Sequence, residues 1–98
     1  MYVGTLSFDL LLGDVHSLKQ KRSVVRPIVA ELQRKYAVSV AETGEQDLYR
    51  RATIGLAAVS GEAGRVTEVL DRCERLVAAR PEVELLSVRR RFHTDEDE

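Results

Sequence analysis

Residues 3–12, VGTLSFDLLL, alternate between two kinds of side chain, with Leu6, Phe8, Leu10 and Leu12 on one side. A period of two with one polar side is typical of a half-buried β-strand. Such a strand must bury its apolar side against another element, so the pattern that follows it decides the fold.

The segment after this strand has a helical period. Apolar residues recur there at spacings of three, four and seven, at Leu18, Val25, Ile28, Val29, Leu32 and Tyr36. Ser17 is the predicted N-cap, because its hydroxyl can accept a hydrogen bond from a free backbone N–H of the first turn. Pro27 lies inside this segment and removes one backbone hydrogen bond. It therefore predicts either a kinked helix or a helix that starts later.

The remaining elements complete one fold. Further strands are predicted at 37–43, 49–59 and 83–92, and a second helix at 62–79. The order β-α-β-β-α-β predicts an α+β, ferredoxin-like sandwich, in which a four-stranded antiparallel sheet of order 4-1-3-2 carries both helices on one face. This topology brings the start of the first helix, the 44–48 hairpin and the Arg80–Pro81 loop to the same end.

The composition limits the classes of protein to which this chain can belong. The 98 residues, 44% of them hydrophobic, suit a single domain, which we place at 1–93, followed by an acidic tail at 94–98 expected to be disordered. Fifteen basic residues nearly balance sixteen acidic ones, which excludes a simple polycation. No apolar run approaches the ~18–20 residues of a membrane span, and no signal peptide is recognisable, so we expect a cytoplasmic protein without a membrane partner.

Charge is concentrated in one segment, since residues 16–36 carry a local charge of +5. Helical spacing places Lys19, Arg22 and Arg26 on one exposed stripe. We predict an RNA- or partner-binding surface made of Lys19, Lys21, Arg22, Arg26, Arg50 and Arg51. A secondary basic patch is predicted at the opposite end, from Arg34, Lys35, Arg89 and Arg91, with Arg90 nearby. Grouped cations bind phosphates; the alternative is a solvated helix face with cations favoured by the helix dipole.

The uncovered face of the predicted sheet has small side chains. Its outward positions are Thr5, Ser7, Asp9, Thr53, Gly55 and Ala57, with Ser39, Ala41, Leu85 and Ser87 alongside. None is aromatic, which argues against the base stacking of an RNA-recognition motif. With Arg89 and Arg91 at its edge, this face either packs against a second copy in a homodimer or is an ordinary solvated surface.

Candidate catalytic groups are few. His16 and Ser17 are neighbours in sequence but not a dyad, because the serine hydroxyl is expected to cap the helix. Glu42, Glu45 and Asp47 crowd the hairpin, where a surface ion-pair cluster is favoured over acid–base work. We find no phosphate-binding glycine loop and no clustered metal ligands, and Cys73 falls on the apolar stripe of the second helix. We therefore expect a non-enzymatic protein with no cofactor and no metal.

Three stretches carry a family resemblance, namely HSLKQKRSVV at 16–25, VSVAE at 38–42 and QDL at 46–48. With Val3-Gly4 and VELL at 83–86, the chain resembles the YlxP-like family of small bacterial proteins of unknown function over roughly residues 1–92. The resemblance implies a ferredoxin-like fold and a bacterial cytoplasmic protein often encoded beside transcription and translation factors and a small-subunit ribosome maturation factor. Family members commonly have histidine where this chain has Glu45, and the family offers no established catalytic residues.

Together these observations predict an accessory protein that contacts RNA or a ribosome-associated partner through the basic residues of its first helix. The alternative is a homodimeric protein-interaction or small-ligand-sensing module that uses the sheet face. The motif residues His16, Ser17, Gln46 and Asp47 meet at one end of the fold. They either bind something together, or Asp47 and Glu42 fix the entrance of the helix by hydrogen bonds and ion pairs.

Overall fold

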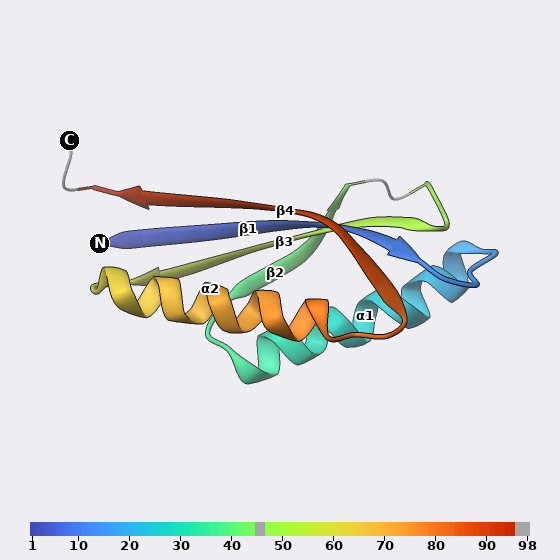
Figure 1. The fold of residues 1–98 in the computed structure, drawn as a ribbon, viewed down its shortest axis with the longest axis horizontal. Coiled ribbons are helices and arrows are strands. Elements are labelled where there is room, and N and C mark those ends of the chain that lie inside the picture. Colours follow the sequence, from blue (N-terminus) through green and yellow to red (C-terminus); the bar gives the residue numbers. More distant parts are fainter. Residues whose placement is uncertain (45–46, 96–98) are drawn as a thin grey trace.

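The predicted order of elements is confirmed in the computed structural model, which describes residues 1–44 and 47–95. The elements are β1 (Tyr2–Leu12), α1 (Leu18–Lys35), β2 (Ser39–Gly44), β3 (Arg51–Ser60), α2 (Ala63–Ala78) and β4 (Val83–Thr94). The strands lie in the order β2-β3-β1-β4, and each neighbouring pair is antiparallel. Both helices lie on one side of the sheet, and the other side is uncovered (Figure 1). This is the ferredoxin-like arrangement.

The helix α1 begins where Ser17 was expected to cap it. The Ser17 backbone is extended, and its Oγ accepts a hydrogen bond of 3.1 Å from the Gln20 N–H. The helix then runs through Pro27 to Lys35, so the proline does not mark a later start. Pro27 is exposed.

The core lies between the sheet and the two helices. The central strand β1 supplies fully buried side chains on its helix-facing side, namely Leu6, Phe8, Leu10 and Leu12. The helices meet them with Val25, Ile28, Leu32, Val66, Leu70, Cys73 and Val77. Each buried aliphatic side chain contributes about 1.5–3 kcal/mol relative to an exposed one, so this layer supplies most of the stability.

A bulge in β4 changes one predicted position. Asp9 pairs with Ser87, but Leu10 pairs with Leu85, so Leu86 is an extra residue without a partner. An extra residue inverts the alternation of side chains beyond it. Leu85 therefore packs against the core from the helix side, and its predicted place on the uncovered face is wrong.

The predicted start of the acidic tail is also wrong. Thr94 belongs to β4, and the Asp95 carboxylate lies 2.9 Å from the Met1 amino group. This hydrogen bond from the amino group lowers the pKa of Asp95. Residues 96–98 lie outside the part of the chain that the structure describes.

Gly4 permits the close approach of α2 to the sheet, and this contact generates a prediction. A Cβ at position 4 would lie 2.6 Å from Leu70 Cδ1 and closer still to Val66 Cγ1. We expect Gly4→Ala to lower the free energy of unfolding by about 1–3 kcal/mol through overpacking. Urea denaturation measures this. In the matched control, Gly64→Ala, the new methyl group meets nothing within 4 Å. The control should be neutral or stabilising by up to about 1 kcal/mol. Equal effects of the two substitutions would contradict the tight contact.

Candidate nucleic-acid interface

Three cations form an exposed row on α1, which we call the α1 ridge: Lys19, Arg22 and Arg26. Their spacing of three and four residues places them on one side of the helix. With Ser23 and Pro27 they line a shallow surface depression of about 340 Å³. Within residues 1–44 and 47–95, no carboxylate pairs with any of the three side chains. The α1 ridge therefore presents three charges whose counterions must come from outside these residues.

Lys21 was predicted to belong to this surface, and that prediction is wrong. The residue is only 2% exposed. Its Nζ donates a hydrogen bond of 2.8 Å to the Leu48 carbonyl and lies 3.2 Å from Glu42 Oε2. Lys21 thus ties α1 to the β2–β3 hairpin and is not accessible to a ligand.

A signal for this burial is present in the sequence. Leu18, Lys21, Val25, Ile28 and Leu32 follow one another at spacings of three and four. Lys21 therefore lies on the apolar stripe of the helix, and not on the stripe of its basic neighbours. A lysine on such a stripe must find a partner for its ammonium group, and Glu42 and the Leu48 carbonyl provide it.

The buried lysine generates a stability prediction. We expect Lys21→Met to lower the free energy of unfolding by about 2–4 kcal/mol, because it leaves the Glu42 carboxylate without its cation in a partly buried place. Replacing both partners, as in Lys21→Met with Glu42→Leu, should recover most of this loss. Urea denaturation of both variants measures the difference. If Lys21→Met alone lowers the free energy of unfolding no more than the double substitution does, the ion pair is contradicted.

Arg50 and Arg51 do not join the α1 ridge, contrary to the prediction. Arg50 Nε donates to the carbonyls of Leu12 and Gly13 at 3.1 and 3.0 Å, which holds the loop after β1. Arg51 forms an ion pair of 2.8 Å with Asp9. Arg51 pairs in register with Leu11. Leu10 and Leu12 face the core, so Leu11 faces the other way. The Arg51 side chain therefore lies on the uncovered side of the sheet.

The predicted secondary basic patch is divided between the two faces of the sheet. Arg34 and Lys35, at the end of α1, lie 3.8 and 3.7 Å from Glu31 on the helix side. Arg89 and Arg91 pair in register with Ser7 and Thr5 on the uncovered side. The alternation of β4 turns Arg90 toward α2, where it pairs with Asp71 at 2.8 Å and Glu74 at 3.3 Å. These residues therefore do not form one surface.

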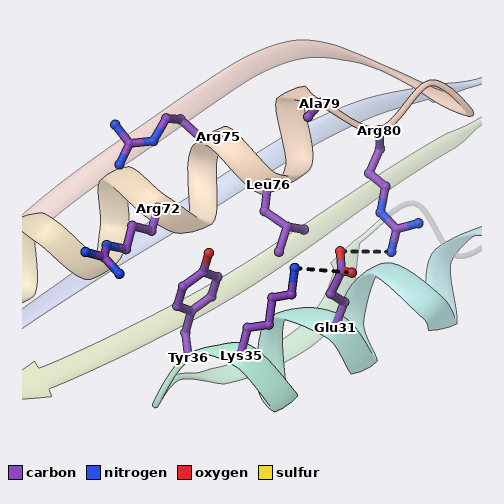
Figure 2. Close-up of a pocket in the computed structure, with 8 residues that line it drawn as sticks. All are labelled: Glu31, Lys35, Tyr36, Arg72, Arg75, Leu76, Ala79 and Arg80. Carbon is purple, nitrogen blue, oxygen red and sulfur yellow. Dashed lines mark ion pairs between the residues drawn. The ribbon is translucent and has the colours of Figure 1, made fainter.

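A hollow of about 470 Å³ lies between the ends of the two helices. Figure 2 shows Tyr36, Lys35 and Glu31 of the α1 side facing Arg72, Leu76 and Arg80 across it. Of its charged side chains, all but Arg75 have an ion-pair partner among the described residues. Glu31 lies 3.2 Å from Arg80 and 3.7 Å from Lys35, and Arg72 pairs with Glu68 at 2.8 Å. We interpret this hollow as an ion-pair brace between the helices and not as a binding site.

The motif residues at the start of α1 have structural roles. Besides the Ser17 cap, Gln20 Oε1 accepts a hydrogen bond of 2.6 Å from the His16 backbone N–H. This reciprocal pair resembles a capping box, whose S-x-x-Q pattern is visible in the sequence. His16 Nε2 contacts Asp14 Oδ1 at 2.6 Å. Asp47 is exposed, and Gln46 and Glu45 lie outside the described residues. Of the two carboxylates expected to fix the helix entrance, Glu42 does so.

A family model described as a protein of unknown function, DUF503, matches residues 3–90. The chain belongs to the DUF503 family. It is 34% identical over 82 residues to the uncharacterized protein YlxP of Bacillus subtilis (strain 168), covering 84% of this chain and 89% of that protein. The YlxP-like resemblance is therefore confirmed.

Comparison with the designed protein Foldit4 supports the fold of this DUF503 chain. The de novo designed protein Foldit4 is similar with a TM-score of 0.58 and 12% identity, over 98% of this chain and all of that one. SnoaB, a cofactor-independent oxygenase from Streptomyces nogalater, has a TM-score of 0.49 and 14% identity, over 96% of this chain and 93% of that one. At such identities the likeness concerns the fold alone.

Three further observations concern the described residues of the DUF503 chain. Within residues 1–44 and 47–95, no three His, Cys, Asp or Glu side chains gather as metal ligands would. No helix in those ranges is long and apolar enough to cross a membrane. Cys73 is fully buried among the core side chains, as predicted, and burial raises the pKa of its thiol to about 11.

The buried thiol generates a pH prediction. The native protein holds the Cys73 proton more tightly than the unfolded chain does, because the pKa is about 11 when folded and 9.0 for an exposed thiol. Stability from this group is complete below pH 9 and is lost as the pH rises from about 9 to 11. The free energy of unfolding should therefore fall more steeply over this window in the wild type than in Cys73→Ala. Urea denaturation at pH 8 and pH 10 measures the two slopes, and parallel slopes would contradict the assignment.

Proposed function

We propose that this DUF503 protein is a non-enzymatic accessory protein that binds RNA through the phosphate backbone, with the α1 ridge as its contact surface. The observation that carries the proposal is the sorting of cations on α1. Lys21 is buried in an ion pair, whereas Lys19, Arg22 and Arg26 have no partner within the described ranges. Arginine and lysine side chains in this arrangement suit phosphate oxygens, and arginine binds them in bidentate fashion.

The chemistry of the ridge favours a phosphate backbone over a protein partner. The other residues that line this surface are Ser23 and Pro27, so it lacks a large apolar side chain. Protein interfaces generally have aromatic or aliphatic anchors at their centre. No aromatic residue occupies the described outward-facing positions of β1 and β3, which likewise argues against base stacking, so we expect little sequence preference. A ribosomal RNA is the target that the expected genomic neighbourhood of the family suggests.

The alternative, a homodimer formed through the uncovered sheet face, has weaker support. A two-fold contact would bring Arg89 and Arg91 of both copies onto one small surface, and these side chains have no carboxylate partner within the residues described. Like charges placed together destabilise such a contact. Static light scattering at tens of micromolar protein measures the mass directly, and we expect that of a monomer.

Filter binding to ribosomal RNA tests the proposal. We expect Lys19→Ala with Arg22→Ala and Arg26→Ala to weaken binding at least about tenfold at 0.1 M salt. The slope of log K against log salt should become shallower by about 2–3, since each lost phosphate contact contributes about 0.7–0.9. The matched control removes three arginines from α2, at positions 65, 72 and 75, and should stay within about threefold of wild type. An equal loss of RNA affinity in both triple variants would contradict the α1 ridge as the RNA-binding surface.

A further inference from the structure

A second surface with unpaired cations lies on the opposite side of the sheet from the α1 ridge. A shallow hollow of about 320 Å³ is found there, which we call the sheet-face hollow. Its polar and small lining residues are Thr5, Ser7, Thr43, Gly55, Arg89 and Arg91. These residues come from all four strands, and among residues 1–44 and 47–95 no carboxylate lines the hollow.

The strand register explains how the hollow forms. Ser7 lies between Gly55 of β3 and Arg89 of β4, and Thr5 lies beside Arg91. No side chain rises from Gly55, and a Cβ there would come 2.9 Å from Thr43 Cγ2. Small residues thus form the floor, Thr43 one wall and the two arginines the other. Neighbouring strands are about 4.8 Å apart, so the long arginine side chains of β4 reach across β1 to the floor.

The donors around the hollow are unused within the described ranges. The hydroxyls of Thr5, Ser7 and Thr43 and the guanidinium groups of Arg89 and Arg91 have no hydrogen-bond or ion-pair partner in residues 1–44 and 47–95. The next outward residue of β1, Asp9, is already paired with Arg51 at 2.8 Å. Five side chains that can donate hydrogen bonds therefore surround this space, and no carboxylate among the described residues lines it.

We propose that the sheet-face hollow binds a phosphate group. A phosphate presents several oxygens in a tetrahedral arrangement, so it can accept from two guanidinium groups on one wall and from hydroxyls on the floor and the other wall. A carboxylate has only two oxygens in one plane and cannot satisfy both walls. The volume exceeds that of inorganic phosphate and leaves room for the remainder of a small phosphate monoester. This site is separate from the α1 ridge, so either proposal can fail while the other stands.

An NMR titration of the ¹⁵N-labelled protein with inorganic phosphate, at constant ionic strength, tests the site. We expect saturable shifts at the amides of Ser7, Gly55 and Arg89. Arg89→Gln with Arg91→Gln should weaken binding at least about tenfold, and Thr43→Val, which exchanges the hydroxyl for a methyl group, about threefold or more. The charge-matched control, Arg65→Gln with Arg75→Gln on α2, should stay within about twofold. Far-UV circular dichroism checks that each variant is folded.

Two further titrations distinguish the source of the phosphate. If adenosine monophosphate binds as tightly as a 5′-phosphorylated hexanucleotide does, the ligand is a small molecule. Tighter binding of the hexanucleotide, lost with its 5′-phosphate, would support an RNA end. Three results would overturn the proposal. The first is the absence of saturable shifts with phosphate, and the second is that Arg89→Gln with Arg91→Gln binds phosphate as tightly as the wild type does. The third is a dimer that forms without phosphate and buries this face.

Discussion

The buried ammonium group of Lys21 fixes the orientation of α1, and the exposed chemistry of the helix follows from it. Its contacts with Glu42 and the Leu48 carbonyl join the first turns of α1 to the β2–β3 hairpin. Because the helix is thereby held at one rotation about its axis, Val25, Ile28 and Leu32 face the sheet. The neighbouring cations at positions 19, 22 and 26 must then face outward. A charged pair of this kind is costly to bury but specifies a single arrangement, which is the role we assign to it here.

The arginines of this small protein divide into two groups. One group is used by the fold: Arg50 holds backbone carbonyls, Arg80 braces the two helices through Glu31, and Arg90 joins β4 to α2. The other group has no partner within the described ranges and includes Arg22 and Arg26 on α1 and Arg89 and Arg91 on the sheet. Net charge conceals this division, because the chain as a whole is at −1. The α1 set and the sheet set lie on opposite sides of the sheet and are therefore separate sites; Arg65 and Arg75 of α2 also have no partner within the described ranges.

Much of the fold could be predicted because its signals are local. The alternation in β1, the cap at Ser17 and the burial of Cys73 each follow from a few neighbouring residues. The bulge at Leu86 could not be predicted, because no glycine or proline marks it in the sequence. The candidate site was predicted only in part. The basic block was found, but the loss of Lys21, Arg50 and Arg51 from it depends on contacts with residues distant in sequence. Lys21 alone gave a usable signal, through its place on the apolar stripe.

The orientation of α1 is the claim on which the RNA interface depends, and lysine accessibility tests it most directly. The chain has three lysines, at positions 19, 21 and 35. Under native conditions, acetylation followed by mass spectrometry should modify Lys19 and Lys35 rapidly and leave Lys21 protected until the protein unfolds. In 6 M urea, expected to unfold a domain of this size, all three should react alike. Modification of Lys21 at the same rate as Lys19 in the folded protein would contradict the buried ion pair, and with it the outward position of the α1 ridge.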